Sequence, residues 1–358
     1  MSRLASIYKR LYEGVNYRLR TVAGGRWAYY CRPTSISVLL TERCNARCVH
    51  CDIWKNRGKE DLPTVEQWEQ ALTDLRKWLG RVQVTFTGGE ALLMPFAPRV
   101  VAHAASLGLL VEHLTHGYWL DQSRVEQLAE ANPWRVTISM DGVGQLHSQI
   151  RGREGFFEKT RQTLETLRRL RRERHLGYTI QLKTVVMAQN LDHVHEVAHF
   201  AREQEAEVFY QPIEQNYNTP EDAHWFEHSS TWPRDSEAAV TAVERLIRLK
   251  NEGLPIANSM AQLEVMIPYF RHPEQMRVAV QAHNAHEGGL LCAALTNLQI
   301  QSNGDVTTCI SLPPVGNIKD GPIRRIWENR PRVWRTGCCL EWRLTPQEKE
   351  ALSLPVLS

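Results

Sequence analysis

Three cysteines lie within a stretch of eight residues, at Cys44, Cys48 and Cys51, with the spacing Cx3Cx2C. Three thiolates on one loop can bind three irons of a [4Fe–4S] cluster and leave the fourth iron open to another ligand, whereas a closed structural zinc site needs four ligands. His50 is a conceivable fourth ligand, but its place directly before Cys51 favours a packing or backbone role. The spacing therefore predicts a cluster with one open iron.

The composition places these cysteines in a nearly neutral chain. The 358 residues include 43 Lys and Arg against 40 Asp and Glu, a formal charge of +3, which argues against a dedicated nucleic-acid binder. The chain has no apolar run long enough to span a membrane and no secretion signal, so we expect a cytoplasmic protein. In a reducing compartment clustered thiols bind metal more often than they form disulfides, and the isolated Cys31 is expected to be a buried, inert thiol.

The elements that must position the cysteines are six short runs rich in β-forming residues, separated by helical patterns. The predicted strands are Ser35–Leu40, Val82–Thr87, Leu110–Thr115, Val136–Met140, Ile180–Val186 and Val208–Pro212. This alternation predicts a parallel α/β sheet built from βαβ units. Six units are too few for a complete eight-unit barrel, and periodicity alone leaves open a partial barrel or a doubly wound sheet.

Three helices are predicted from apolar spacing. Thr64 and Gln67 predict a cap for the first, the second covers about Phe157–Glu173, and the third covers Ser236–Glu252. The second helix carries a run of arginines, which suggests either an anionic partner or a solvated face. We favour the solvated face, because acidic residues elsewhere nearly cancel the charge.

Further motifs follow the predicted strands. Thr87-Gly88-Gly89-Glu90 ends the second strand, Thr115-His116-Gly117 ends the third, and Ser139-Met140-Asp141-Gly142 ends the fourth and precedes Ile150-Arg151-Gly152. In this order, after the cysteine array, they resemble the radical S-adenosylmethionine (SAM) superfamily. The resemblance covers about residues 34–215 and implies a partial (β/α)6 TIM-like barrel with SAM across the carboxyl ends of the strands.

The resemblance also implies roles for single residues. Cys44, Cys48 and Cys51 would hold the cluster whose open iron chelates SAM, and the cleaved cofactor would give a 5′-deoxyadenosyl radical that abstracts a substrate hydrogen. The implied cofactor-binding residues are Gly88, Gly89, Glu90, Ser139, Arg151, His50 and Thr115.

Within that set, the Gly-Gly-Glu motif would hold the methionine amino group, with glycines because the backbone must approach a ligand closely. Ser139 suits the ribose, and the fork of Arg151 suits the carboxylate. His116 stands where relatives usually carry Asn. Asp141 is expected either to cap a helix or to contact substrate.

A second cysteine group lies near the carboxyl end. Cys292 and Cys309 flank a predicted hairpin that turns at Asn303-Gly304, and Gly316-Asn317-Ile318-Lys319 and Ile326-Trp327 follow. This pattern resembles the SPASM and twitch auxiliary-cluster domains. The implied ligands of one auxiliary [4Fe–4S] cluster are Cys292, Cys309, Cys338 and Cys339. Because neighbouring side chains of an extended chain point to opposite faces, two hypotheses stay open: four cysteines with a kinked 338–339 peptide, or three cysteines with an open iron.

These patterns divide the chain into five expected segments. They are an N-terminal helical extension at 1–33, the radical SAM partial barrel at 34–215, a helical connector at 216–286, a small α+β twitch or SPASM-like auxiliary-cluster domain at 287–345, and a tail at 346–358.

The expected activity is a radical SAM oxidation in which the auxiliary cluster accepts an electron or binds substrate. Because only 34 residues precede the first strand, we expect a carbohydrate or other small-molecule substrate rather than a ribosomal peptide, the alternative. An electron donor such as flavodoxin or ferredoxin is an expected partner; nucleic acid and a membrane span are not. A zinc-binding structural or interaction protein is the hypothesis from another class.

No acid or base for later chemical steps is assigned. His116, Lys183 and Tyr210 lie at or near predicted strand ends and could reach the cavity, but each has an ordinary packing or hydrogen-bonding alternative.

Overall fold

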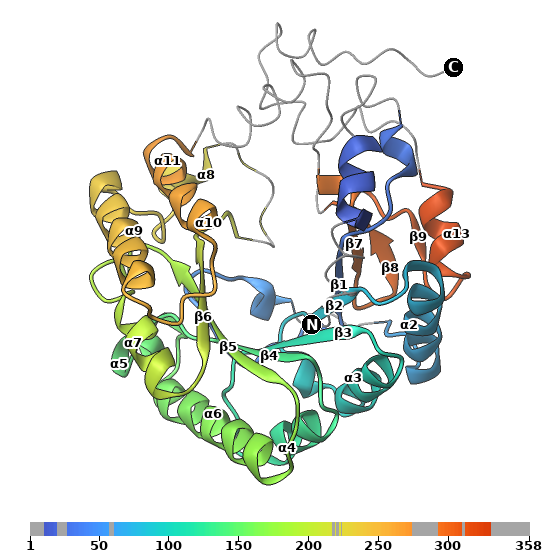
Figure 1. The fold of residues 1–358 in the computed structure, drawn as a ribbon, viewed down its shortest axis with the longest axis horizontal. Helices are drawn as coiled ribbons and strands as arrows, with labels where there is room; N and C mark the ends of the chain where they lie inside the picture. The colour runs from blue at the N-terminus through green and yellow to red at the C-terminus, as the bar shows by residue number, and fades with distance from the viewer. Residues whose placement is uncertain are drawn as a thin grey trace, which may run out of the picture.

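The computed structural model describes residues 11–19, 27–56, 61–216, 219, 222, 224–273, 293–309 and 312–330. Its centre is a curved sheet that lines the inside of an open horseshoe, with helices along the outside (Figure 1). The strands are β1 (Ser35–Leu39), β2 (Gln83–Thr87), β3 (Leu110–Thr115), β4 (Arg135–Ser139), β5 (Thr179–Val186) and β6 (Glu207–Pro212). Neighbouring strands pair in parallel from β1 to β6. The predicted partial barrel is confirmed, in an open form.

The helices of this part of the chain are α2 (Val65–Leu79), α3 (Ala97–Ser106), α4 (Ser123–Glu130), α5 (Gln145–Ile150), α6 (Phe156–Glu173), α7 (Glu196–Glu203), α8 (Trp225–His228), α9 (Ser236–Asn251), α10 (Met260–Glu264) and α11 (Met266–Arg271). Helices α2 to α7 follow the strands and lie along the outside of the horseshoe, whereas α8 to α11 follow β6 at one end of it, where α10 and α11 pack against α9 (Figure 1). The predicted cap of α2 is a capping box, in which Gln67 N donates to Thr64 Oγ1 and Thr64 N donates to Gln67 Oε1. None of the described helices is long and apolar enough to cross a membrane.

The arginine-rich helix α6 carries its own counter-charges. Arg168 pairs with Glu205 at 2.9 Å, Arg169 pairs with Glu173 at 2.9 Å, and Arg174 pairs with Glu130. Exposed pairs of this kind contribute little to stability. Their presence favours the solvated-face interpretation over an anionic partner.

The two faces of the sheet differ in chemistry, because alternate side chains of a strand point to opposite sides. Outward residues such as Val38, Phe86 and Leu182 are fully buried under the helices. The inward face, which we call the inner trough, is mostly polar. It is formed by Ser37, Thr85, Glu112, Arg135, Thr137, Ser139, Lys183, Phe209 and Gln299.

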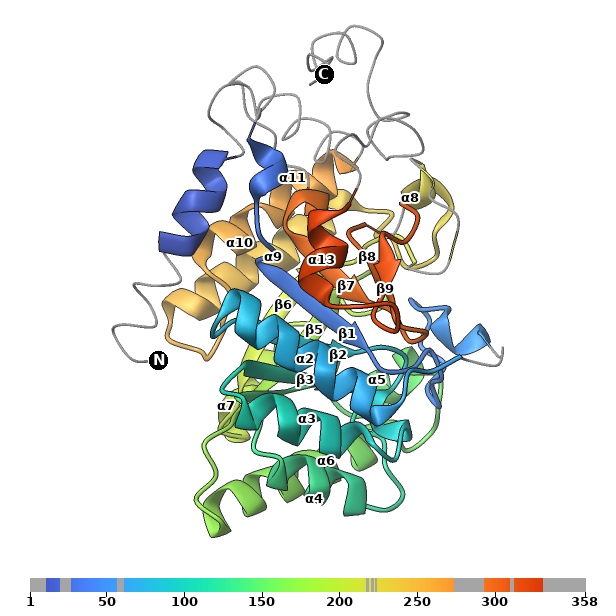
Figure 2. The same ribbon diagram turned by 90° about the vertical axis from the view of Figure 1, so that its right-hand side faces the viewer.

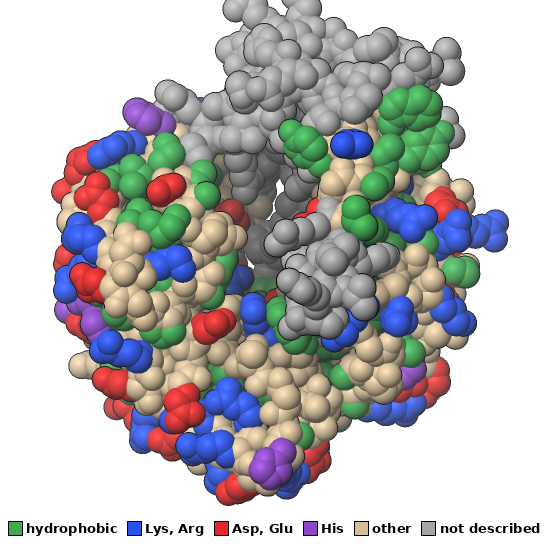
Figure 3. Space-filling view, viewed as in Figure 1, with side chains coloured by type: hydrophobic (Ala, Val, Ile, Leu, Met, Phe, Trp, Pro, Cys, Tyr) green, Lys and Arg blue, Asp and Glu red, His purple; other side chains and the backbone are tan. Residues whose placement is uncertain are grey.

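A hollow lies in the middle of the molecule, between the side that carries α9 and α10 and the side that carries β7 and β8 (Figure 3). The inner trough lines the inside of the same curve (Figure 1). The half-exposed polar groups show that this interior is not a packed barrel core. An open, polar interior suits the binding of a polar ligand.

The predicted C-terminal hairpin extends the same sheet. Strand β7 (Asn297–Ile300) pairs in parallel with β1, β8 (Asp305–Thr307) pairs antiparallel with β7, and β9 (Gly316–Asn317) completes a nine-stranded order. At the predicted turn, Gly304 has a φ of 90°. Figure 2 shows β7 beside β1, close to helices α2 and α13 (Ile323–Glu328).

Helix α13 ties this hairpin to the N-terminal part of the chain. The rings of Trp78 on α2 and Trp327 on α13 lie 6.2 Å apart. Trp327 Nε1 donates to the carbonyl oxygen of Cys31, and the Cys31 side chain is 1% exposed. The prediction that Cys31 is buried is confirmed.

Candidate cofactor site at the carboxyl ends of the strands

The cysteine loop, residues 41–51, is held by backbone hydrogen bonds from two of the predicted motifs. Gly89 N donates to Thr41 O and Glu90 N donates to Arg43 O, both at 2.8 Å. On the other side, Arg47 N donates to Arg151 O at 3.1 Å. The Gly-Gly-Glu and Ile-Arg-Gly motifs therefore form a clamp around the loop that carries the cysteines.

The glycines of the two motifs make this clamp possible. A Cβ atom on Gly89 would lie 2.3 Å from Arg43 O, and one on Gly152, which has a φ of +69°, would lie 2.2 Å from Arg47 O. Any side chain there would push the cysteine loop away. The sequence interpretation assigned the close approach at Gly88 and Gly89 to a ligand, whereas the contacts of both glycines are with the backbone of the cysteine loop.

The three cysteine side chains gather around one small apolar cluster. Cys48 is 8% exposed and packs with Tyr118 and Phe156, and the half-buried Cys44 and Cys51 pack against the same cluster. Burial raises the pKa of the Cys44 thiol to about 12 and also raises that of Cys51. Because ligands bind iron as thiolates, binding of a cluster here must displace protons.

The donor set fits a [4Fe–4S] cluster. Three thiols of one loop pack on the same apolar cluster, and the adjacent His50 has a buried Nδ1 without a hydrogen-bond partner. Burial lowers the His50 pKa to about 4, so the ring is neutral near pH 7. An uncharged ring with an orphaned nitrogen beside the cysteines suits a site completed by another group.

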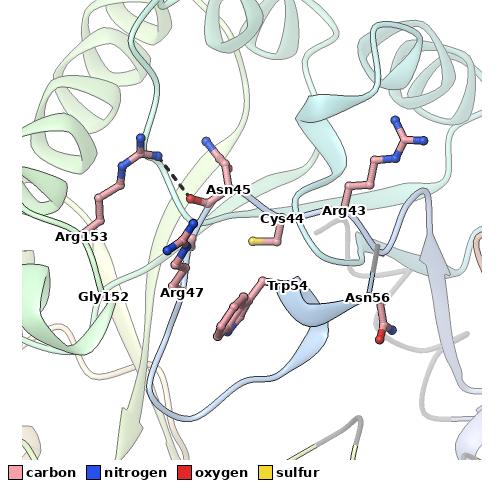
Figure 4. A pocket seen from close by; sticks show the side chains of 9 residues that line it. Arg43, Cys44, Asn45, Arg47, Trp54, Asn56, Gly152 and Arg153 are labelled. Atoms are coloured by element: carbon pink, nitrogen blue, oxygen red, sulfur yellow. Dashed lines mark hydrogen bonds between the residues drawn. The ribbon is translucent and has the colours of Figure 1, made fainter. Parts of the chain in front are cut away.

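A cavity of about 690 Å³ opens on the cysteine loop. Figure 4 shows the Cys44 side chain directed into it between Arg47 and Trp54. Arg43 and Arg153 also line it, and Arg153 Nη1 donates to Asn45 O at 3.3 Å. This side of the loop is therefore open to solvent and rich in positive charge.

Glu90 is the buried centre of the strand-end contacts. Its carboxylate is 1% exposed and accepts hydrogen bonds from Leu92 N at 3.2 Å, from Thr115 Oγ1 at 3.0 Å and from His116 N at 2.8 Å. Burial nevertheless raises the pKa of Glu90 to about 7. A carboxylate offers about four acceptor positions, so one remains for an outside donor such as an amino group.

His116 links this centre to the cysteine loop. Its Nδ1 accepts a hydrogen bond from Tyr118 N at 2.9 Å, so Nε2 carries the proton and donates to Asn45 Oδ1 at 2.6 Å. Burial lowers the His116 pKa to about 3, which keeps the ring neutral. His116, which stands where relatives usually carry Asn, thus holds Asn45, and Asn45 directly follows Cys44. Sequence reasoning missed Asn45 as a site residue.

Arg151 has two partners within the chain. Its Nη2 lies 2.6 Å from Asp141 Oδ2, and its Nη1 donates to Cys48 Sγ at 3.5 Å. Asp141 is fully buried and also accepts from Val185 N at 2.9 Å. Burial raises the pKa of Asp141, but the Arg151 guanidinium and the hydrogen bond from Val185 N are among the effects that together outweigh burial, so the pKa lies below its ordinary value and the carboxyl is ionised. Asp141 pairs with Arg151, and it does not cap a helix.

The remaining single-residue expectations fall into two groups. Thr115 is buried against Glu90, and Ser139 ends β4 on the inner trough. Tyr210 is fully buried and its hydroxyl donates to Val194 O at 3.2 Å, which is the ordinary packing and hydrogen-bonding role. Lys183 lies half-buried on the inner trough.

Only part of the second cysteine group can be placed. Cys309 is half-buried just after β8. Cys292, Cys338 and Cys339 lie outside the described residues, so the alternatives of three or four cysteine ligands stay predictions.

Comparison with known proteins agrees with this site. Residues 38–201 match the model of the radical SAM superfamily, and residues 292–350 match the model of an iron-sulfur cluster-binding domain, SPASM. The second match includes all four cysteines of the second group.

Two curated relatives differ in how much they share. The AdoMet-dependent heme synthase of Methanosarcina barkeri is 26% identical over 310 residues, 83% of this chain and 82% of that protein. The sporulation killing factor maturation protein SkfB of Bacillus subtilis is 33% identical over 136 residues, which are 38% of this chain and 33% of that protein.

Among solved structures, SuiB of Streptococcus suis bound to S-adenosylmethionine has a TM-score of 0.64 at 16% identity, over 85% of this chain and 69% of that one. This likeness shows the fold.

Proposed function

Because the chain belongs to the radical SAM superfamily and carries a SPASM domain, we propose that it is a radical SAM enzyme that modifies a peptide. The radical SAM domain implies SAM and a [4Fe–4S] cluster, and the SPASM domain implies auxiliary iron–sulfur binding. The observation that carries the proposal is the clamp that presents Cys44, Cys48 and Cys51 together at the strand ends.

The chemistry is divided between cofactor and protein. A bound, reduced cluster and SAM would together supply radical chemistry that removes a hydrogen from substrate. Cys44, Cys48 and Cys51 would hold three irons. Glu90 would accept the methionine amino group at its remaining acceptor position, and Ser139 would contact the ribose. Tyr118 and Phe156 exclude water from the buried side of the cysteines.

The choice of a peptide rests on the relatives. SkfB is named as a maturation protein, and a Streptomyces rochei relative, 37% identical over 110 residues, is named a peptide cyclase. The expectation of a carbohydrate finds no support among these relatives, and neither does a zinc-binding structural protein.

A second candidate is a reaction on a tetrapyrrole. It is favoured by one specific observation: the match to the heme synthase spans 83% of this chain, whereas the match to SkfB spans 38%. The two candidates are separated by supplying a peptide pool and coproporphyrin III to the same enzyme and measuring which of them is modified.

The cavity at the cysteine loop supports a route for electrons. Arg43, Arg47 and Arg153 surround the opening toward Cys44. Positive charge attracts acidic partners and speeds their encounter. We propose that an acidic one-electron carrier of the flavodoxin or ferredoxin class docks at this opening.

The test is anaerobic reconstitution with iron and sulfide, followed by iron analysis and measurement of 5′-deoxyadenosine by mass spectrometry. About eight irons per chain would support one auxiliary cluster beside the SAM cluster, and about four would support the SAM cluster alone. A colourless protein that forms no 5′-deoxyadenosine with dithionite would overturn the proposal. Single replacement of Cys338 and of Cys339, with iron counted in each, decides between four and three ligands: full iron in one variant excludes the four-cysteine form.

A further inference from the structure

Lys183 stands at the boundary between the cofactor site and the rest of the inner trough. It lies on β5, directly across from Ser139 at the end of β4 and from Phe209 on β6. Residues paired across a parallel sheet point to the same face, so Lys183 shares the trough with both. One neighbour is the expected ribose contact, and the other is the half-exposed ring of Phe209.

The other charged side chains of the trough have close partners. Glu112 accepts hydrogen bonds from Gln83 Nε2, Thr85 Oγ1 and Thr137 Oγ1. Arg135 donates to Gln181 Oε1 at 3.3 Å and lies 4.3 Å from the centre of the Trp134 ring. These charges are fixed in place by the fold.

The Lys183 amine has no such contact. Within the described part of the chain, no hydrogen bond or direct ion pair holds it. Burial lowers its pKa, while the more distant carboxylates of Glu112, Glu214 and Asp141 oppose that shift. Glu112 already has three donors, Asp141 is paired with Arg151 at 2.6 Å, and Glu214 is exposed after β6.

A partly buried charge without a partner is costly, and proteins keep one where a ligand supplies the partner. Packing does not explain why a lysine stands at position 183, because an apolar side chain would fill the same space without the cost of burying a charge. A lysine ammonium is a compact charge that suits a carboxylate.

We infer that Lys183 binds a carboxylate of the substrate and so helps to determine which substrate the enzyme accepts. The inference rests on the proposed function. Both substrate candidates can supply this chemistry, as an acidic side chain of a peptide or as a propionate of a tetrapyrrole. A carboxylate bound at Lys183 would hold the substrate beside Ser139, at the strand ends where the cofactor is expected.

The experiment compares probes that differ only in charge. The reconstituted full-length protein is titrated with coproporphyrin III and its tetraamide, and with a peptide pool containing a central Glu and the same pool containing Gln. The variants are Lys183→Gln, Lys183→Arg and the matched control Lys77→Gln, which alters an exposed lysine of α2.

The expected result is that wild type and Lys77→Gln bind the acid form of at least one pair about tenfold more tightly than the neutral form. Lys183→Gln loses this preference, and Lys183→Arg keeps most of it. Equal binding of both forms by wild type, or an unchanged preference in Lys183→Gln, overturns the inference.

A separate readout distinguishes a carboxylate of the substrate from the carboxylate of SAM. It also separates a failure of this inference from a failure of the proposed function. SAM itself has a carboxylate, so 5′-deoxyadenosine formed without any substrate is measured in every variant. Loss of this product in Lys183→Gln but not in Lys77→Gln would place Lys183 at the cofactor and overturn the inference. Its absence from wild type would overturn the proposed function, while the binding titrations would still decide the role of Lys183.

Discussion

The cysteine loop and the inner trough are neighbouring regions that differ in how their charged side chains are paired. Around the loop, Glu90, His116 and Arg151 each make two or more hydrogen bonds or ion pairs, and the loop backbone is clamped from two sides. In the trough, by contrast, Lys183 has no direct partner among the described residues. A region whose charged groups are paired within the fold is pre-organised, whereas a region with an unpaired charge is completed by its ligand. The comparison suggests that the fold fixes the cofactor half and leaves the substrate half open.

The largest expected effect comes from Cys48→Ala. Loss of one of three cluster ligands should lower 5′-deoxyadenosine formation on the order of a thousandfold and lower the iron content by about four per chain. Cys31→Ala, which alters a buried cysteine outside the loop, is the control and should keep both. Equal activity in the two variants would break the assignment of the loop.

Asp141→Asn should be the next most damaging change, because it leaves the buried Arg151 guanidinium without a counter-charge. Removing one partner of a buried pair costs about 3–5 kcal/mol of the free energy of unfolding. Urea unfolding measures this loss. Glu165→Gln, which breaks the exposed pair with Arg161, should cost less than about 1 kcal/mol. Similar losses in both variants would argue against a special rigidity at the cofactor site.

SAM binding should depend on pH through Glu90, whose pKa is raised by burial to about 7. Above that pH the carboxylate is ionised and attracts the methionine ammonium; as the pH falls below it, the charge is lost. The dissociation constant of SAM should therefore rise about tenfold for each pH unit below 7. Calorimetric titration between pH 5 and 8 measures it, and a constant affinity would remove Glu90 from the SAM site.

His116→Ala should have a smaller effect, because it removes one hydrogen bond to Asn45 beside Cys44. Loss of such a bond costs about 1 kcal/mol and leaves the loop less fixed. Iron retained after incubation with a chelator should fall. His116→Asn should restore part of it, since an amide can also donate to Asn45, and failure of this rescue would point to ring packing instead.

The smallest expected effect has the opposite sign. Lys183→Met replaces an unpaired, partly buried charge with an apolar side chain of similar length, so the free energy of unfolding should stay unchanged or rise by about 1 kcal/mol. Urea unfolding of Lys183→Met and of Asp141→Asn, measured side by side, gives the two changes in the free energy of unfolding. A loss of more than about 1 kcal/mol would mean that Lys183 is held by the fold.

Much of the fold followed from local patterns. The six parallel strands begin and end within one residue of the predicted runs, because β-branched alternation and the capping signal at Thr64 are local properties. The openness of the barrel could not be derived from periodicity, since it depends on which strands pair. The resemblance supplied that expectation.

The site was predicted less completely. The motifs pointed to the strand ends, but the contacts of Arg151 with Asp141 and Cys48 join residues up to 103 positions apart, which no spacing rule connects. No sequence pattern pointed to Asn45 as a site residue. The only related sign was the unusual His116, to which Asn45 is hydrogen-bonded. The unpaired state of Lys183 depends on what its neighbours already bind, and this is visible only in three dimensions.

The most direct test of the division between the two regions is the amount of 5′-deoxyadenosine formed from SAM and dithionite without substrate, measured side by side in Cys48→Ala and Lys183→Gln. We expect no product above background in Cys48→Ala and an amount within about twofold of wild type in Lys183→Gln. Loss of the product in both variants, or its persistence in both, would contradict a rigid cofactor half beside an open substrate half.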